Sequence, residues 1–182
     1  MKTSEHSYCF DSAIDLAASI RKKEISSVEL LDEYKKQYQL SNSQLNAIVT
    51  VDFDAARIRA KQLDDLTAKK QFLGPLHGLP ITVKDTFKTK DMRTTAGAEE
   101  FSDNVPSENA DAVQRVIDAG AIIFGKTNTP RFAADIQTNN KVFGITNNPW
   151  DLSRTSGGSS GGSAAATATG LTAFEVGSDV GG

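Results

Sequence analysis

The sequence predicts an α/β fold, because segments with the apolar period of a helix alternate with short segments that are apolar throughout. Residues 110–119 carry apolar side chains at helical spacing, and residues 120–125 form an apolar run bounded by glycines. Residues 78–84 form a second short apolar run, which ends in a lysine. Short apolar runs beside amphipathic helices are typical of buried strands in a sheet that helices cover.

The N-terminal part, residues 1–70, is predicted to be mainly helical. Residues 11–23 have apolar side chains at helical spacing, with Asp11 or Ser12 as the N-cap and cations at the end. A second helix begins at a capping-box pattern in residues 26–29 and extends to about Gln39. We interpret both helices as packing elements rather than as catalytic ones.

A strand and a third helix follow. Residues 47–51 are short and β-rich, which predicts a strand, and residues 54–70 repeat alanine, isoleucine and leucine at helical spacing. The glycine and proline in residues 73–76 break this helix and lead into the strand that ends at Lys84.

The second half continues the alternation. Residues 94–97 are predicted to form a loop, and residues 126–130 to lie at the exit of the strand 120–125. Residues 139–150 are polar and contain asparagines and a proline, so we expect a surface loop near the site. The last predicted strand is 171–176.

Composition limits the classes of function. With 182 residues, 38% hydrophobic and 24% charged, the chain is ordinary for one globular domain. A net charge of −3 without a basic cluster gives no electrostatic case for binding nucleic acid or a membrane, so we expect a small-molecule partner. Cys9 is the only cysteine, which excludes an internal disulfide. We expect no metal, no cofactor and no export signal, and hence a cytoplasmic protein.

The glycine-rich run 155–166 and the strand that ends at Lys84 together indicate a site. Small hydroxyl residues on a glycine backbone lead into an alanine-rich helix, so the run predicts a tight loop that can present N–H groups to an anion. Alone, Lys84 is more often a solvated lysine paired with Asp85, and the glycine run a linker or a phosphate-binding nest. The combination favours a site built from serine and lysine.

Other polar residues have plainer interpretations. Lys126 lacks the preceding glycine spacing of a P-loop lysine. His77 has no acidic or cysteine partner at metal-ligand spacing, so we interpret it as structural. Ser160 and Ser163 are expected to serve loop and helix-cap hydrogen bonds.

Several motifs occur in a defined order along most of the chain. They are Gly78-Leu79-Pro80 with Lys84-Asp85, Gly125-Lys126-Thr127-Asn128, Asn147-Asn148-Pro149, Gly157-Gly158-Ser159-Ser160-Gly161-Gly162-Ser163 and Gly177-Ser178-Asp179. In these motifs the chain resembles the N-terminal part of the amidase signature family, serine hydrolases that use a triad of serine, cis-serine and lysine. The resemblance implies a mixed-sheet α/β fold with helices on both faces, whose C-terminal half lies beyond this sequence.

The resemblance assigns roles to the residues of the two motifs. Lys84 corresponds to the base, and Ser159 to the bridging serine, whose peptide bond to Gly158 is cis in the family. Ser160 and Asp179 would support the loop. A free lysine has a pKa near 10.4, so a lysine base must be desolvated to be neutral at physiological pH, and the end of a buried strand allows this.

The family's acylated serine follows the glycine pair that is here Gly181-Gly182, so it would be the next residue, past the end of this sequence. The oxyanion hole maps onto the backbone N–H groups of Val180, Gly181 and Gly182. Residues 1–182 would then be the N-terminal part of one domain, helical over 1–70 and catalytic over 71–182.

The implied function is hydrolysis of a carboxamide C–N bond in a small-molecule amide, with the isolated chain inactive because the nucleophile is missing. One alternative is the A-type catalytic subunit of an amidotransferase, which acts within a complex on aminoacyl-tRNA. A second is a truncated relic or binding module without turnover. In each case a homo-oligomer or a complementing chain is expected to cover the strand edges that the missing half would cover.

Overall fold

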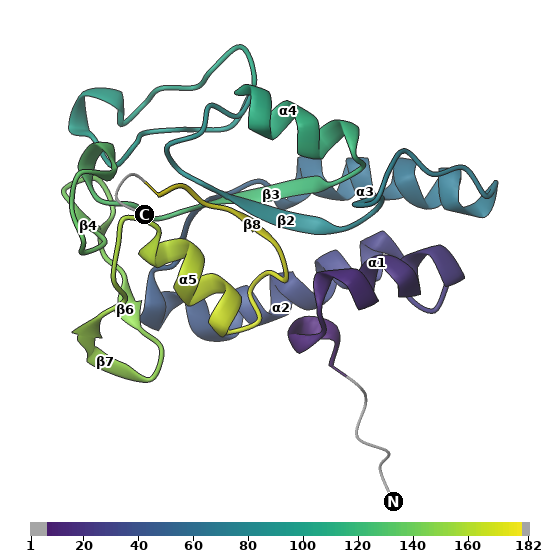
Figure 1. Ribbon diagram of the computed structural model, residues 1–182, viewed down its shortest axis with the longest axis horizontal. Helices are drawn as coiled ribbons and strands as arrows, with labels where there is room; N and C mark the ends of the chain where they lie inside the picture. The colour runs from purple at the N-terminus through teal and green to yellow at the C-terminus, as the bar shows by residue number, and fades with distance from the viewer. Residues whose placement is uncertain (1–6, 180–182) are drawn as a thin grey trace, which may run out of the picture.

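The computed structural model describes residues 7–179, which form a small sheet with helices on both sides (Figure 1). The α-helices are α1 (Ala13–Lys22), α2 (Ser27–Leu45), α3 (Phe53–Ala68), α4 (Asp111–Asp118) and α5 (Gly161–Ala168). The strands of the main sheet are β1 (Ile48–Val51), β2 (Pro80–Lys84), β3 (Ile122–Thr127) and β8 (Glu175–Val176). Short 3-10 helices span Tyr8–Phe10, Glu99–Phe101 and Arg131–Ala133.

Within the described residues the main sheet has the order β1-β3-β2-β8. Strand β2 is parallel to β3 and to β8, and β1 is antiparallel to β3. Helices α1, α2 and α5 lie on one side of the sheet and α4 on the other (Figure 1). The predicted mixed sheet with helices on both faces is therefore confirmed, and the N-terminal part contributes one of its strands.

The pairing of β2 with β3 contains a bulge. Ile81 pairs with Ile123 and Thr82 with Gly125, so Phe124 is an extra residue on β3. Beyond the bulge, Val83 pairs with Lys126 and Lys84 with Thr127. Since side chains alternate along a strand, Lys84 and Lys126 point to opposite faces of the sheet.

Local signals account for where the helices begin. Ser12 caps α1 by accepting a hydrogen bond from the backbone of Asp15. Ser26 and Glu29 form both bonds of the predicted capping box at the start of α2.

Helix α2 does not end near Gln39 as predicted but continues to Leu45. Its last turns contain polar residues that bond within the fold: the buried side chain of Asn42 donates to the carbonyl of Ile48 and accepts from the backbone N–H groups of Ala47 and Ile48. The asparagine thus ties the helix end to the start of β1, which the apolar pattern did not show.

Three further predictions are corrected. Lys126 lies inside β3 rather than at its exit, and only Glu175–Val176 of the run 171–176 is a strand. The segment 139–150 is not a simple surface loop, because Asn140 and Thr146 are buried. It forms two small sheets, β4 (Asn139–Asn140) with β5 (Gly144–Ile145) and β6 (Asn147–Asn148) with β7 (Asp151–Thr155).

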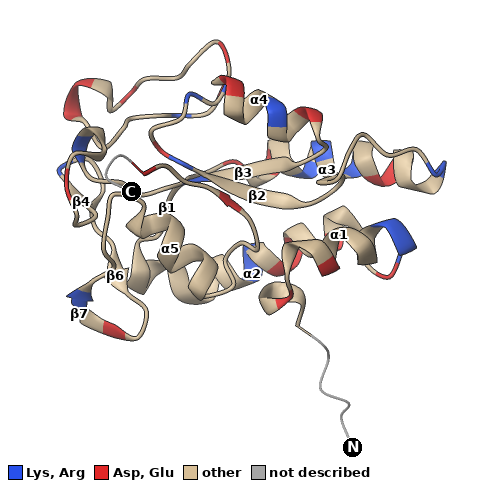
Figure 2. Ribbon diagram, in the orientation of Figure 1, with Lys and Arg blue, Asp and Glu red and all other residues tan. Residues whose placement is uncertain are grey.

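The core joins the N-terminal helices to the sheet. The rings of Tyr34 on α2 and Phe53 on α3 both stack on Phe124 of β3, with centroids 5.9 and 5.5 Å away. Acidic and basic residues are interspersed along the helices and loops (Figure 2). None of the helices in residues 7–179 has both the length and the apolar character that a membrane crossing requires.

Candidate active site

The carboxyl ends of the parallel strands meet at one edge of the sheet, where open α/β sheets commonly bind ligands. Lys84 is the last residue of β2, and Thr127, its register partner, is the last residue of β3. The N-terminus of α5 and the segment after β8 reach the same edge. A hollow of about 430 Å³ opens there, lined by Gly158, Ser159, Ser160, Gly177, Ser178 and Asp179.

The side chain of Lys84 is buried beside this hollow and contacts two serines. Its Nζ lies 2.7 Å from Ser159 Oγ, so the predicted hydrogen-bond contact between these residues is confirmed. It also lies 2.9 Å from Oγ and 3.3 Å from the carbonyl oxygen of Ser178. Burial lowers the pKa of Lys84, and the negative charges of Asp179 and Glu175 oppose this shift.

All three contacts are to oxygen atoms, so an ammonium can donate to each of them. A neutral amine has two hydrogens and one lone pair, so it can occupy the same position by donating twice to Ser178 and accepting the hydroxyl proton of Ser159. The arrangement therefore lets Lys84 take a proton from Ser159 without moving.

The backbone around Ser159 holds its hydroxyl in place. The Gly158–Ser159 peptide bond is cis, as in the family that the sequence resembles. Thr129 Oγ1 donates to the carbonyl of Ser159 at 3.1 Å. A Cβ at Gly158 would lie 2.8 Å from the carbonyl carbon of Ile136 and 2.9 Å from the nitrogen of Gln137, so only glycine fits here.

Helix α5 begins in close contact with the exit of β3. A Cβ at Gly162 would lie 2.4 Å from the backbone nitrogen of Asn128 and 2.5 Å from its carbonyl oxygen. The N–H of Gly161 donates to Thr138 Oγ1, which in turn donates to the carbonyl of Gly157. The glycine-rich run is thus held on both sides, and its serines have fixed positions.

Two further serines of the run, Ser160 and Ser163, bond differently. Ser160 serves the loop as expected: its Oγ donates to the carbonyl of Ser178 at 2.9 Å and accepts from the N–H of Ser178 at 3.3 Å. Ser163 is not a helix cap. It is buried within α5, with its Oγ 2.9 Å from both Thr127 Oγ1 and Glu175 Oε1.

A second buried lysine lies on the opposite face of the sheet. Lys126 Nζ donates to the carbonyl of Phe87 and to the hydroxyls of Thr89 and Thr94. Burial lowers its pKa to about 8. Asp85 is hydrogen-bonded to the N–H and the hydroxyl of Thr95, not to Lys84.

Sequence reasoning missed Glu175, which is partly buried on β8 among hydroxyl groups. Thr82 Oγ1 donates to Oε2, and Thr127 Oγ1 and Ser163 Oγ donate to Oε1 at 2.8 and 2.9 Å. Burial raises the pKa of Glu175 to about 7. The signal was present, because a single carboxylate stands in the otherwise uncharged run 171–176.

The remaining candidate residues are placed as follows. Asp179 lines the hollow and is exposed, whereas Val180, Gly181 and Gly182 lie outside the described residues. His77 is buried and its Nε2 lies 3.0 Å from Thr67 Oγ1, in keeping with a structural role. No group of three or more metal-binding side chains occurs in residues 7–179.

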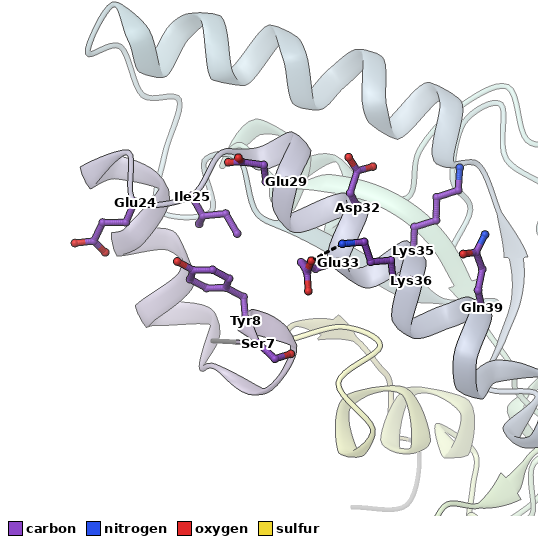
Figure 3. A pocket seen from close by; sticks show the side chains of 10 residues that line it. All are labelled: Ser7, Tyr8, Glu24, Ile25, Glu29, Asp32, Glu33, Lys35, Lys36 and Gln39. Atoms are coloured by element: carbon purple, nitrogen blue, oxygen red, sulfur yellow. Dashed lines mark hydrogen bonds and ion pairs between the residues drawn. The ribbon is translucent and has the colours of Figure 1, made fainter. Parts of the chain in front are cut away.

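A larger hollow of about 850 Å³ lies against α2, away from Lys84 (Figure 3). Several of its acidic side chains are already engaged: Glu29 in the capping box, Asp32 with Arg57 and Glu33 with Lys36. Size alone therefore does not identify the site, and the paired serine and lysine do.

Comparison with known proteins gives a consistent result. A family model described as Amidase matches residues 29–182. The chain is 42% identical over 174 residues to the A-type subunit of glutamyl-tRNA(Gln) amidotransferase of Geobacillus thermodenitrificans (strain NG80-2), covering 95% of this chain and 36% of that protein. It is 42% identical over 163 residues to the protein of the same name from Prochlorococcus marinus (strain MIT 9211), covering 90% and 34%.

Solved structures are also similar. One is "Fatty acid amide hydrolase", with a TM-score of 0.90 and 31% identity over 96% of this chain and 31% of that chain. Another is described as "Crystal structure of amidase", with a TM-score of 0.84 and 36% identity over 91% and 38%. The chain spans about a third of the length of the curated relatives it matches.

Proposed function

The chain belongs to the amidase family, and we propose that it supplies the lysine and bridging-serine part of a serine hydrolase site that cleaves carboxamide C–N bonds. The observation that carries the proposal is the 2.7 Å contact between Lys84 Nζ and Ser159 Oγ beside an open hollow. The lowered pKa of Lys84 supports its use as a base, because only a neutral amine can accept a proton.

In this mechanism Lys84 and Ser159 relay a proton. Ser159 passes its hydroxyl proton to Lys84 and takes the proton of the attacking serine, whose oxygen forms a bond to the amide carbon. The relay then runs in reverse and protonates the leaving nitrogen as the C–N bond breaks. Water attacks the resulting ester through the same relay and releases the carboxylic acid.

The attacking serine is proposed to follow Gly182 in the full-length protein. The backbone N–H groups of Val180, Gly181 and Gly182 would stabilise the oxyanion, as donors placed before the reaction do in other acyl-transfer sites. Gly158, Ser160 and Asp179 would hold the loop around the relay. We also treat residues 1–182 as the N-terminal part of one domain, because β1 pairs with β3 across the boundary at residue 70.

The catalytic component of an amidotransferase is the second candidate, supported by the names of the 42%-identical relatives. The two candidates share the relay and differ in the fate of the released nitrogen, which a hydrolase loses to solvent and an amidotransferase transfers to an acceptor, and in the need for partner chains. A hydrolase acts alone on a small amide, whereas an amidotransferase component requires its complex and a charged tRNA.

The full-length protein separates these candidates. It is incubated alone with a panel of small primary and aryl amides, and acid release is measured. Hydrolysis that Lys84→Ala and Ser159→Ala each abolish supports the hydrolase. Release of ammonia from glutamine only in the presence of tRNA and partner chains supports the amidotransferase, and inactivity in both assays supports a binding module.

The 182 residues alone are expected to hydrolyse no amide above background, because loss of a triad nucleophile typically costs several orders of magnitude. They also leave β8 at the edge of the described sheet. We propose that the rest of the full-length chain, a second copy or a partner covers this edge. Sedimentation at micromolar concentration tests this, and a compact monomer that binds no hydrophobic dye would contradict it.

A further inference from the structure

A partly buried acid shares a face of the sheet with Lys84. Glu175 is the register partner of Thr82, and Lys84 follows Thr82 by two residues, so the three side chains point to the same side. Thr127, the register partner of Lys84, lies on that face and bonds to Glu175. Helix α5 covers the group through Ser163.

The contacts around the carboxyl group need one more hydrogen than the hydroxyls supply. Thr82, Thr127 and Ser163 each contact a carboxyl oxygen, and Thr127 and Ser163 also contact each other at 2.9 Å. Each of these hydroxyls has one hydrogen to donate, so one contact remains without a hydrogen if Glu175 is ionised. A protonated carboxyl group supplies it by donating to Thr127 or Ser163, so that all four contacts are hydrogen bonds. If all three hydroxyls donate to an ionised Glu175, the contact between Thr127 and Ser163 is not a hydrogen bond.

The charge of Glu175 acts on the base of the proposed relay. The ionisable groups that act on Lys84 are Asp179, with the larger effect, and Glu175, both on the segment from β8 onward. Asp179 is exposed and screened by water, whereas Glu175 is only partly exposed. On the far face, the charges of Glu175 and Asp85 also act on Lys126.

We propose that Glu175 is a positioning residue for the proton of Lys84: as a neutral acid it leaves the lysine able to be a neutral base, and on ionising it holds the lysine as an ammonium. The inference rests on the proposed function, in which Lys84 is the base. A neutral lysine with a neutral acid holds as many protons as an ammonium with a carboxylate, so the two groups titrate as a pair. The pKa of about 7 for Glu175 agrees with a proton kept near neutral pH.

The test uses full-length protein with isotope-labelled lysine and glutamate, and NMR follows the titration of Lys84 and Glu175. In the wild type the Glu175 carboxyl is expected to remain protonated well above the ordinary range of glutamate. In Glu175→Gln, which keeps the shape and removes the charge, the midpoint of Lys84 is expected to fall by about half a unit to one unit. The acidic limb of the plot of hydrolysis rate against pH should move to lower pH by the same amount.

Asp85→Asn is the matched control, since it changes a buried carboxyl to an amide next to Lys126 rather than Lys84. It should leave the midpoint of Lys84 unchanged. An unchanged midpoint in Glu175→Gln, or an equal fall in Asp85→Asn, overturns the inference. A Glu175 carboxyl that is ionised in the wild type at mildly acidic pH overturns it even if the variants fail to fold.

The outcomes also separate this inference from the proposed function. If the titration midpoint of Lys84 falls in Glu175→Gln but the protein hydrolyses no amide, the coupling is supported and the hydrolase function is contradicted. If hydrolysis depends on Lys84 but the titration midpoint of Lys84 is unchanged in Glu175→Gln, the hydrolase function is supported and the coupling is contradicted.

Discussion

Lys84 and Lys126 stand one residue apart in register on neighbouring strands, and both are 0% exposed. They differ in their surroundings. The ammonium of Lys126 is enclosed by a carbonyl and two threonine hydroxyls from the segment after β2. The Nζ of Lys84 faces Ser159 and Ser178 at the edge of a hollow.

The difference shows that burial and a lowered pKa do not by themselves mark a catalytic lysine. Both lysines have a pKa lowered by burial. Lys126 is surrounded by acceptors that hold a segment of chain, so it acts as a structural cation. Lys84 contacts a hydroxyl that can itself exchange a proton, and a substrate can reach that hydroxyl from the hollow.

The largest expected effect comes from removing each lysine in turn. In the full-length protein, Lys84→Met should lower amide hydrolysis by about a thousandfold or more, because the relay loses its base. Lys126→Met should retain activity within about tenfold, because Lys126 touches no group of the relay. Steady-state rates with circular dichroism as a folding control measure this, and equal losses would erase the distinction.

The pH dependence of stability tests the surroundings of Lys126. Its pKa is about 8 in the fold, against 10.5 for an ordinary lysine, so between these values the unfolded chain binds more protons than the folded one. Stability should therefore rise with pH through this window, by up to about 3 kcal/mol. Urea unfolding at both ends of the window tests this. The rise should be smaller in Lys126→Met, where only the lowered pKa of Lys84 still contributes, and an equal rise in the variant would contradict the assignment.

A methyl group added at the start of α5 should disturb the surroundings of Lys84 and not those of Lys126. Gly162→Ala places a Cβ against the backbone of Asn128 and should cost about 2 kcal/mol of stability together with most of the activity. Ala164→Gly, at an exposed position of the same helix, should cost only about 1 kcal/mol and spare activity. A fully active Gly162→Ala protein would show that the close approach is not needed.

The smallest expected effect is that of Ser178. Ser178→Ala removes one of the oxygens that contact Lys84 and should lower the rate about tenfold. Ser178→Thr keeps the hydroxyl and should restore most of the rate. If the alanine and threonine variants were equally impaired, packing rather than the hydroxyl would explain the loss.

Sequence reasoning worked where the determinants are local. The caps of α1 and α2 are set by residues within one turn, and the sequence predicted both. The contact of Lys84 with Ser159 spans 75 positions and was predicted from the resemblance to a family, not from periodicity. The polar end of α2 was missed because the partners of Asn42 belong to the next strand.

The surroundings of Glu175 and Lys126 were missed for the same reason. The three hydroxyls around Glu175 come from β2, β3 and α5, and only the folded sheet brings them together. In the sequence, Lys126 appeared at a strand exit, because the apolar run ends at Gly125, whereas β3 continues to Thr127. The face on which Lys126 lies cannot be assigned before the bulge is known.

The bulge at Phe124 decides which lysine faces which side. A β-strand alternates its side chains, so if Phe124 took a regular place in the ladder opposite Thr82, each later residue of β3 would shift by one pair and change faces relative to β2. Lys126 would then point toward α5 beside Lys84, and Thr127 would turn away from Glu175. Two ammonium groups would share one buried compartment, and the acid would lose a donor. The bulge in β3 thus keeps the structural ammonium of Lys126 and the proton-accepting amine of Lys84 on opposite faces of the sheet.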